Sequence, residues 1–410
     1  MIDVAIMGHG VVGSGVAEIL ISHRKSIADK AKNEINIKYI LDLRDFEGLS
    51  YSDKFIKDFN IILRDPDIRV VVEVMGGIAP AYEYVKACLL SGKSVVTSNK
   101  ELVAAKGAEL LKIANEKNVN FLFEASVGGG IPVLRPIAQC LAANELTEIV
   151  GILNGTTNFI LTKMIKDNMA FDDALKLAQK LGYAEKDPTA DIEGHDACRK
   201  ICILASLGFG KHVYPQQVAT QGITDIELDD VDYADKFNYV IKLIGHAKKL
   251  DNGQITANVY PALISRNNML SGVSDVFNAV MVYGDAIGEV MFYGRGAGKS
   301  PTASAVVADV IDCVKHLVAR KYLSWDDGDI NYVAKSDTSI TKLYIRIKTD
   351  NVDKLCNEID NIFGETTFKI KNNSEKEVVF VTEYDIESKL LENLEKIQGV
   401  NNIKVLHVLD

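Results

Sequence analysis

A glycine-rich turn near the N-terminus constrains the fold of this 410-residue chain more than any other feature. The apolar run Val4–Met7 leads into Gly8-His9-Gly10-Val11-Val12-Gly13, and an amphipathic stretch then continues to about His23. A strand, a GxGxxG turn and a helix in this order are typical of dinucleotide binding, because the helix N-terminus offers free N–H groups to a pyrophosphate. We therefore predict an N-terminal Rossmann-type parallel sheet.

Strand-like and helix-like segments then alternate as far as residue 123. This alternation predicts a doubly wound parallel sheet, in which ligands bind beyond the carboxyl ends of the strands. The predicted strands are Ile37–Leu41, Val70–Val74, Val95–Thr97 and Asn120–Phe123, and the predicted helices are Ala81–Leu90 and Glu101–Lys117.

The ends of two predicted strands carry candidate cofactor contacts. Ser98 and Lys100 follow one strand, and a lysine at a helix N-terminus is unfavourable unless an anion offsets its charge. The second strand ends with Asp42 and Arg44. An acid there accepts bonds from the ribose hydroxyls of NAD, whereas an arginine pairs with the 2′-phosphate of NADP. Both residues are present, so the choice between NAD and NADP stays open.

Composition excludes several classes of protein. The net charge of −10 argues against nucleic acid or an anionic membrane as a partner. No apolar run approaches the ~20 residues of a membrane span, and the N-terminal apolar run is too short for a signal peptide. The six cysteines are scattered without a CxxC motif, so we expect a reducing cytoplasm.

A second dense motif, at residues 182–200, places several acids before a lysine. Asp187-Pro188 predicts a turn, and one helix is expected from there to about Leu207. This helix is apolar nearly all round and should be buried, with Asp196 and Lys200 on one face. A lysine in that setting is a candidate acid or base, and a plain ion pair is the alternative. The acids taken as candidates are Glu185, Asp187, Asp191 and Asp196.

Two further segments are rich in glycine. Residues 124–132 read as an exit from the sheet toward another domain, and residues 294–300 lack the first glycine of a Walker A motif. The second segment is better read as a turn before a helix that begins near Pro301, and residues 309–318 are expected to be helical. His9 and His195 are interpreted as having no catalytic role.

Together these motifs resemble the homoserine dehydrogenase family over roughly residues 1–320. The matching segments are GHGVVG at 8–13, TSNKELVA at 97–104, EASVGGGIP at 124–132, GILNGTTNFIL at 151–161, GYAEKDPTADIEGHDACRK at 182–200 and GRGAGKSPTASAV at 294–306. The resemblance implies NAD(P)-dependent interconversion of L-homoserine and L-aspartate 4-semialdehyde, in threonine, methionine and isoleucine biosynthesis.

The resemblance also implies roles for individual residues. Lys200 corresponds to the proposed proton donor to the aldehyde oxygen, and Lys100 to the second active-site lysine. Glu185 corresponds to the residue that binds the substrate amino group. The other implied substrate contacts are Asp191, Asp196, Thr156 and Tyr183. The implied cofactor contacts are Gly8, Gly10, Val11, Val12, Gly13, Arg44, Ser98, Lys100 and Gly298. A monovalent cation, usually sodium, would lie at Glu124, Val127, Gly129 and Ile131.

The chemistry is consistent with these residue types. Reduction of an aldehyde needs a hydride on one face and a proton for the developing alkoxide. Two lysines can stabilise that oxygen, and one of them can donate the proton. An amino-acid substrate carries both an ammonium and a carboxylate, so its site needs charges of both signs. Because the lysines come from different predicted domains, the active site is expected between them.

Residues 341–410 differ in character from the rest. Leu343, Ile345 and Ile347 alternate with polar residues, which predicts a half-buried strand. A βαββαβ order follows, with helices at Val352–Phe363 and Ile386–Ile397 and strands near Thr367–Lys371, Val378–Thr382 and Lys404–Leu409. This order resembles an ACT domain. The turn at residues 350–353 lacks the glycine common at ACT ligand sites, so threonine feedback and a dimerising or structural role both stay open.

The whole chain is thus predicted to be α/β with three domains. Residues 1–130 form the dinucleotide-binding domain, which is completed by about 300–320, and residues 131–299 form an α+β catalytic and dimerisation domain. Residues 341–410 form the ACT-like domain, and a homodimer or higher homo-oligomer is expected. Two alternatives are another Rossmann oxidoreductase of amino-acid metabolism and a nucleotide-sensing regulator without activity. Intact Lys100, Glu185, Asp196 and Lys200 argue against the regulator.

Overall fold

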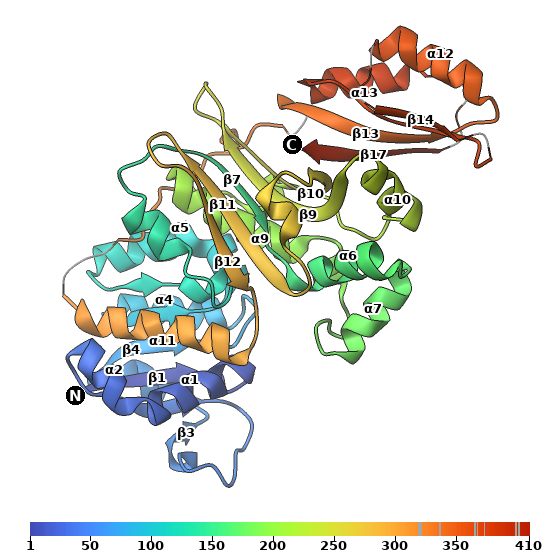
Figure 1. The fold of residues 1–410 in the computed structure, drawn as a ribbon. Coiled ribbons are helices and arrows are strands. Elements are labelled where there is room, and N and C mark those ends of the chain that lie inside the picture. Colours follow the sequence, from blue (N-terminus) through green and yellow to red (C-terminus); the bar gives the residue numbers. More distant parts are fainter. Residues whose placement is uncertain are drawn as a thin grey trace. The chain divides into compact units, whose positions relative to one another are not determined.

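A computed structural model describes residues 1–318, 322–335, 338–364, 366, 368–372, 374–397, 400 and 402–410 (Figure 1). Contacts between residues divide the chain into two compact units. Unit 1 contains residues 1–149, 199–217 and 278–330, and unit 2 contains residues 150–198, 218–277 and 331–410. This division places Lys200 in unit 1 together with Lys100.

Unit 1 is built on a parallel sheet of six strands, ordered β3-β2-β1-β4-β5-β6. This order is that of dinucleotide-binding folds, so the predicted Rossmann-type sheet is confirmed. Its elements are β1 (Ile2–Met7), α1 (Val11–Ser22), α2 (Arg24–Ala31), β2 (Ile35–Leu41), β3 (Phe55–Ile56), α3 (Phe59–Arg64), β4 (Ile68–Glu73), α4 (Ala81–Leu90), β5 (Ser94–Thr97), α5 (Lys100–Glu116) and β6 (Phe121–Leu122).

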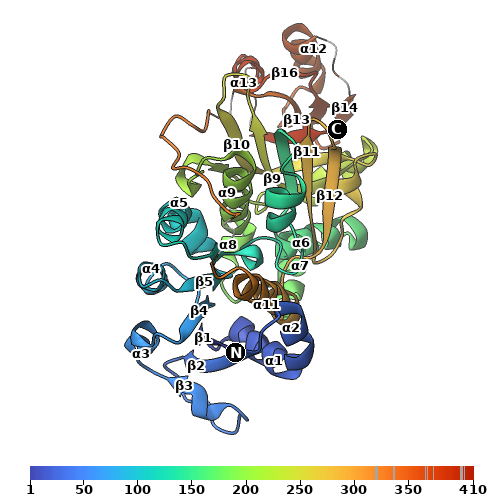
Figure 2. The same cartoon turned by 90° about the vertical axis from the view of Figure 1, so that its left-hand side faces the viewer.

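Helices cover both faces of this sheet (Figure 2). Helices α1, α2 and α11 lie on one side, and α3, α4 and α5 lie on the other. The central strands are therefore buried on both faces, which explains the unbroken apolar run Val70–Val72. Gly15 of α1 allows the close packing of α11, because a Cβ there would lie 2.9 Å from the Ala303 Cβ.

Unit 1 also holds later parts of the chain. The predicted helix near Pro301 and the helical residues 309–318 are one helix, α11, which ends at Lys315. Its N-cap is Gly298, with φ of +127°. The elements here are α11 (Lys299–Lys315), β12 (Gly288–Arg295) and most of β7 (Leu146–Ile152), α9 (His195–Phe209) and β11 (Phe277–Gly284).

Unit 2 contains an antiparallel pair of long strands, β9 and β10, which pair over their full eleven residues. The C-terminal strand β17 adds to β10 in parallel, through Ala262 beside His407. The elements are α6 (Gly155–Asp167), α7 (Phe171–Lys180), α8 (Thr189–Ile192), β8 (Ala219–Thr220), α10 (Leu228–Lys236), β9 (Tyr239–Lys249), β10 (Ile255–Ser265), β13 (Ile340–Lys348), α12 (Val352–Phe363), β14 (Phe368–Asn372), β15 (Glu377–Val381), β16 (Asp385–Ile386), α13 (Glu387–Glu395) and β17 (Asn402–Leu409).

The C-terminal residues contain the elements of the predicted βαββαβ order, with one additional two-residue strand, β16, before α13. The strands of the sheet are arranged β17-β13-β15-β14, and β16 pairs with β13. Thr367, the first residue of one predicted strand, lies outside the described residues. Helices α12 and α13 cover one face of the sheet, where Ile345, Ile359 and Leu390 form part of a core (Figure 1).

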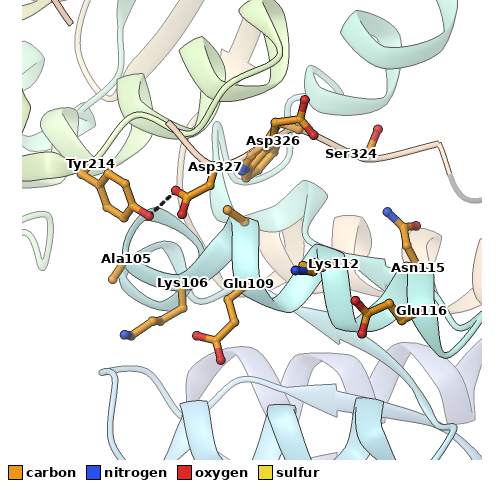
Figure 3. A pocket seen from close by; sticks show the side chains of 12 residues that line it. Ala105, Lys106, Glu109, Lys112, Asn115, Glu116, Tyr214, Ser324, Asp326 and Asp327 are labelled. Atoms are coloured by element: carbon orange, nitrogen blue, oxygen red, sulfur yellow. Dashed lines mark hydrogen bonds between the residues drawn. The ribbon is translucent and has the colours of Figure 1, made fainter. Parts of the chain in front are cut away.

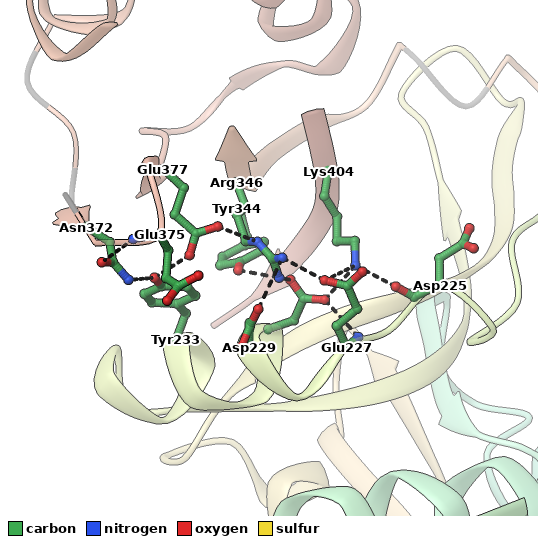
Figure 4. A network of polar contacts seen from close by, with 11 residues as sticks. Asp225, Glu227, Asp229, Tyr233, Tyr344, Arg346, Asn372, Glu375, Glu377 and Lys404 are labelled. Carbon is green, nitrogen blue, oxygen red and sulfur yellow. Dashed lines mark hydrogen bonds and ion pairs between the residues drawn. The ribbon is translucent and has the colours of Figure 1, made fainter. Parts of the chain in front are cut away.

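The predicted half-burial of the first strand in this region is wrong. Tyr344 and Arg346 on the opposite face of β13 are 0% and 4% exposed. Helix α10 supplies carboxylates that contact this face, as Figure 4 shows. The polar pattern suggested solvent, but it marks a buried network of charges.

The single helix predicted after Pro188 is also wrong, because two helices are present. Helix α8 ends at Ile192 and α9 begins at His195. Gly194 between them has φ of +81°, which continues neither helix and which glycine adopts at little cost. The predicted burial of the second helix is confirmed, since Ile201, Cys202 and Leu204 are fully buried.

None of the helices in the described residues combines the length and apolar character needed to cross a membrane.

Candidate active site

The glycine-rich turn has the geometry that dinucleotide binding requires. Gly8 has φ of +98°, and a Cβ on Gly13 would lie 2.0 Å from the carbonyl oxygen of Gly8. A Cβ on Gly10 would meet no atom within 4 Å, so space remains beside the start of α1. The turn is thus closed by Gly8 and Gly13 and open at Gly10, with Val11 and Val12 at the free helix N-terminus.

A cavity of about 410 Å³ adjoins this turn. Gly8, Gly10, Asp42, Arg44 and Lys57 are among its lining residues. It lies at the carboxyl ends of β1 and β2, where the fold places the adenosine half of a dinucleotide.

Asp42 at this cavity has several hydrogen-bond donors. Its carboxylate accepts bonds from the Arg44 Nε at 3.0 Å, the Arg44 Nη2 at 2.9 Å and the His9 main-chain N–H at 2.8 Å. The Arg44 guanidinium holds the pKa of Asp42 well below its usual range. The Arg44 side chain is itself 62% exposed, so it can turn toward a ligand.

His9 is buried among aromatic rings rather than aimed at chemistry. Its Nε2 lies 3.2 Å from the Tyr51 hydroxyl, and its ring packs edge-on against Phe46 and Phe55. Burial lowers its pKa. Through these contacts His9 packs residues 46–55 against the glycine-rich turn.

Lys100 is the first residue of α5, at the carboxyl end of β5. The Asn99 side chain caps the helix by accepting from the Leu102 N–H at 3.1 Å. The Asn99 N–H in turn donates to the Thr97 Oγ1 at 2.9 Å. Ser98 lies between these two residues, so the path of the chain through Ser98 and Lys100 is set by hydrogen bonds on both sides.

An ion pair connects the two segments that carry the predicted lysines. The Arg199 Nη1 lies 3.1 Å from the Glu101 Oε1, with the two side chains 29% and 34% exposed. Glu101 follows Lys100 and Arg199 precedes Lys200 in the sequence. The Glu101–Arg199 pair therefore brings the segments that carry Lys100 and Lys200 into the same part of unit 1. Lys200 is buried there.

The predicted substrate residues of unit 2 form a second group. The Asn154 Nδ2 lies 2.7 Å from the Asp191 Oδ1 and 2.9 Å from the Asp196 Oδ2. The Thr156 Oγ1 donates to the carbonyl oxygen of Tyr183 at 2.7 Å. Residues at the start of α6 thus contact all four positions: Asn154 binds the two acids, and Thr156 binds the main chain of Tyr183.

Glu185 is exposed, as Tyr183 is, whereas the other three predicted substrate residues are half-buried or buried. No hydrogen bond or ion pair of its carboxylate occurs within the described residues, so its oxygens remain available to a cation. Its main-chain oxygen accepts from the Gln179 Nε2 at 3.1 Å, which fixes the backbone but not the side chain.

The predicted cation segment is a buried loop. The Glu124 carboxylate accepts from the main-chain N–H groups of Val133, Leu134 and Arg135 at 2.6–2.8 Å. Its side chain therefore caps the following helical turn, and only its main-chain oxygen could face an ion. Among the described residues, no group of three or more His, Cys, Asp or Glu side chains could hold a metal.

A larger cavity, of about 610 Å³, lies between α5 and residues 324–327 (Figure 3). Lys106, Glu109 and Asp327 are among the lining residues, and the Tyr214 hydroxyl donates to Asp327 at 2.6 Å. It contains none of the predicted site residues. We therefore do not assign the cofactor or the substrate to it.

The structure thus collects the predicted residues into groups within each unit. Unit 1 holds the glycine-rich turn, Arg44, Ser98, Gly298, both lysines and the loop 124–131, and unit 2 holds the predicted substrate residues. Sequence reasoning missed Asn154, Lys57 and the Glu101–Arg199 pair. Only Asn154 carried a usable signal, because Asn-Gly after a strand predicts a helix cap.

This parallel sheet, its glycine-rich turn and the charged cavity beside it define a protein of the dinucleotide-binding class. A family profile for the homoserine dehydrogenase NAD-binding domain matches residues 8–124, and the homoserine dehydrogenase profile matches residues 132–311. The chain belongs to the homoserine dehydrogenase family, and it is an oxidoreductase of amino-acid biosynthesis.

Individual relatives support this assignment over the whole length. The chain is 39% identical to the homoserine dehydrogenase of Bacillus subtilis, over 98% of this chain and 97% of that protein. It is 39% identical to the enzyme of Synechocystis, over 88% of this chain and 85% of that protein. The crystal structure of a homoserine dehydrogenase from Thiobacillus denitrificans superimposes with a TM-score of 0.92 at 34% identity, covering 100% of this chain and 98% of that one.

One further relative was solved with a dinucleotide. It is a hyperthermophilic archaeal homoserine dehydrogenase mutant in complex with NADPH, with a TM-score of 0.64 and 28% identity over 76% of this chain and 97% of that one. The chain has an NAD-binding domain and is an NAD(P) enzyme. The family membership therefore decides against both the unrelated Rossmann oxidoreductase and the inactive regulator.

Proposed function

We propose that Lys200 donates the proton and Lys100 stabilises the same oxygen when L-aspartate 4-semialdehyde is reduced to L-homoserine. The bound dinucleotide supplies the hydride to the carbonyl carbon. As that bond forms, negative charge develops on the substrate oxygen, and a positioned ammonium stabilises it before the proton moves. The observation that carries this proposal is the Glu101–Arg199 ion pair, which joins the segments bearing the two lysines.

The predicted acids are proposed to act on the substrate ammonium. The exposed Glu185 carboxylate binds the substrate ammonium, and Asp191 and Asp196 keep the surroundings negative. Thr156 and Tyr183 lie beside the acids and complete the substrate contacts. An amino acid is thus recognised by opposite charges at its ammonium and at its reacting oxygen.

Homoserine-dependent reduction of NAD and NADP tests the lysine roles. We expect Lys200→Ala to lower kcat by about 10²–10⁴-fold, the usual contribution of a general acid. Lys200→Arg keeps the charge but cannot release a proton near neutral pH, so it should remain similarly impaired. Lys112→Ala removes an exposed lysine of α5 and should leave turnover unchanged. Normal turnover of Lys200→Arg would assign Lys200 an electrostatic role only.

The cofactor preference is proposed to favour NADP. Two cations, Arg44 and Lys57, line the cavity at the end of β2, and they suit a 2′-phosphate. The single acid there, Asp42, is already engaged by Arg44 and His9. We expect Arg44→Ala to raise the KM for NADP about tenfold or more while it changes the KM for NAD less. Equal changes in both KM values would contradict this preference.

A sodium ion fits the loop that contains Val127, Gly129 and Ile131. In the part of the chain that the structure describes, no hydrogen bond ends on the main-chain oxygens of these three residues, although all three are buried. Buried oxygens without donors favour a hard cation. Together with the Glu124 main-chain oxygen, they would hold the ion and fix the loop. Replacing sodium by tetramethylammonium should lower both turnover and the melting temperature.

The C-terminal region is proposed to be ACT-like. The βαββαβ order and the strand arrangement β17-β13-β15-β14 support this assignment. Inhibition of homoserine turnover by added threonine would assign it an effector site, and unchanged turnover would leave a structural role.

The chain is also proposed to form a homodimer or higher oligomer, which light scattering tests. The six cysteines form no disulfide, which suits the proposed cytoplasmic location.

A further inference from the structure

Asn154 connects two of the proposed substrate acids through its side chain. It follows β7 and precedes α6, and its side chain is buried, with 5% of the residue exposed. One atom, its Nδ2, contacts both the Asp191 Oδ1 and the Asp196 Oδ2, at 2.7 and 2.9 Å. The acids belong to α8 and α9, so a single amide joins three helix ends of unit 2.

The orientation of this amide is determined by its other end. The Asn154 Oδ1 accepts from the Thr157 main-chain N–H at 2.8 Å, as the cap of α6, and lies 3.1 Å from the Thr157 Oγ1. A main-chain N–H can only donate, so the atom that faces it must be the oxygen. The NH₂ group therefore faces the two carboxylates. A flipped amide would lose the cap and set its carbonyl against two anions.

This arrangement addresses an electrostatic problem. Two carboxylates close together repel each other, and a shared proton is the usual outcome when nothing else compensates. A hydrogen bond to the charged form favours that form, and Asn154 offers one N–H to each acid. The amide adds no charge of its own, so these two bonds position the acids without neutralising them.

We propose that Asn154 is a positioning residue of the reaction, which holds Asp191 and Asp196 ionised and at a set separation without touching the substrate. The proposal rests on the substrate roles given above for the two acids. It extends those roles to a residue of a different motif, GILNGTT, whose only evident local role is to cap a helix.

Substitutions can separate the helix-capping role of Asn154 from its bridge, the contact of its NH₂ group with both Asp191 and Asp196. Serine and aspartate are both good N-cap residues, so Asn154→Ser and Asn154→Asp should preserve α6. Serine is too short to reach both acids, and aspartate replaces the donor NH₂ by an acceptor oxygen and so adds a third carboxylate. Asn351→Ser makes the same change at the cap of α12, where the Asn351 Oδ1 accepts from the Lys354 N–H at 3.0 Å.

The measurements are kcat, KM for homoserine and the pH profile of kcat/KM on the full chain with bound cofactor. We expect Asn154→Ser to lower kcat/KM by about 10²-fold, the usual cost of misplacing groups at a reacting centre. Asn154→Asp should lose more, and the acidic limb of its pH profile should move to higher pH. Asn351→Ser should match the wild type in all three readouts.

Two results would overturn the proposal. One is an Asn154→Ser enzyme with kcat/KM within twofold of wild type while Asp196→Asn is impaired, because the acids would then act without the bridge. The other is a loss of activity that follows the loss of thermal stability, with an unchanged pH profile, because that would indicate a cap alone. Normal turnover of both Asp191→Asn and Asp196→Asn would instead contradict the roles of the acids themselves.

Discussion

Two cations of unit 2, Arg346 and Lys242, are equally buried but have opposite surroundings. Arg346 is 4% exposed, and its guanidinium contacts the carboxylates of Asp230 at 2.8 Å, Glu377 at 3.1 Å and Glu227 at 2.6 Å (Figure 4). Lys242 is 2% exposed, and among the described residues its Nζ contacts neutral oxygens alone, the Asn158 Oδ1 at 3.1 Å and the Val273 carbonyl at 2.6 Å.

The difference shows that partners, rather than burial alone, decide the state of a buried cation. Burial would lower the pKa of Arg346, but Asp230 and the neighbouring acids raise it above its usual value. Burial lowers the pKa of Lys242 to about 8 because no carboxylate contacts it within the described residues. Arg346 therefore belongs to a network of compensated charges that joins α10 to the C-terminal sheet. The positive charge of Lys242 has no such compensation in the described residues, so it lowers the stability of the folded chain.

The largest effect should come from breaking the compensated network. Arg346→Met leaves Asp230 and Glu377 buried without their main cation, and such a loss usually costs about 3–5 kcal/mol. Urea unfolding measures it. Arg266→Met is the matched control, because Arg266 pairs with Asp235 at an exposed position and should cost about 1 kcal/mol or less. Equal losses for the two variants would contradict the comparison.

The second effect concerns Lys242 and depends on pH. Its folded pKa of about 8 lies below the ordinary 10.5, so the unfolded chain binds more protons between these values. Stability should therefore rise with pH across this interval, by about 3 kcal/mol for this group. The rise should be absent in Lys242→Met and present in Lys248→Met, which changes an exposed lysine of the same strand. Parallel curves for wild type and Lys242→Met would contradict the assignment.

A smaller effect is expected at the edge of the Arg346 network. The Tyr233 hydroxyl donates to the Glu377 Oε1 at 2.5 Å and accepts from the Asn372 Nδ2 at 2.7 Å. Tyr233→Phe keeps the ring and removes one bond to a charged group, which should cost about 2 kcal/mol. Denaturant unfolding of Tyr233→Phe, Arg346→Met and the double variant measures their coupling. Strict additivity would indicate that the tyrosine lies outside the network.

The smallest effect should come from a cation that is partly solvated. Arg199 and Glu101 are about one-third exposed, so their coupling in a double-mutant cycle should be below about 1 kcal/mol. Arg199→Gln and Glu101→Gln, alone and combined, measure it by thermal unfolding. A coupling as large as that of Arg346 would show that exposure does not rank these ion pairs.

Much of the fold could be predicted because its signals are local. The bounds predicted for α4 and α12 match the structure, since helical periodicity and flanking turns lie within a few residues of each other. The errors fell where distant residues intervene. The break at Gly194 separates α8 from α9, and a Cβ at Gly194 would lie 3.1 Å from the Thr220 Cγ2 and 3.2 Å from the Val259 Cγ1. These two residues lie 26 and 65 positions further along the chain. The polar face of β13 was assigned to solvent because nothing local announces that α10 covers it.

The candidate site divides in the same way. The glycine-rich turn could be identified from residue type and spacing alone, and the two lysines and the acids of residues 182–200 could be proposed from the resemblance of their motifs to the family. The bridge from Asn154 to Asp191 and Asp196 could not, because it joins side chains 37 and 42 residues apart. Likewise, the sequence shows that Arg346 is positively charged, but it does not show which carboxylates surround it.

The sequence by itself determined the parallel sheet with its dinucleotide turn and the family, and it supplied the candidate residues of the site. Periodicity, glycine at a tight turn and the order of short motifs are properties of neighbouring residues, so they survive without coordinates. Only the tertiary structure decided which charges are paired, which amide holds two acids and which polar face is buried. Those outcomes depend on the balance between desolvation and contact with distant partners, and the folded chain alone sets that balance.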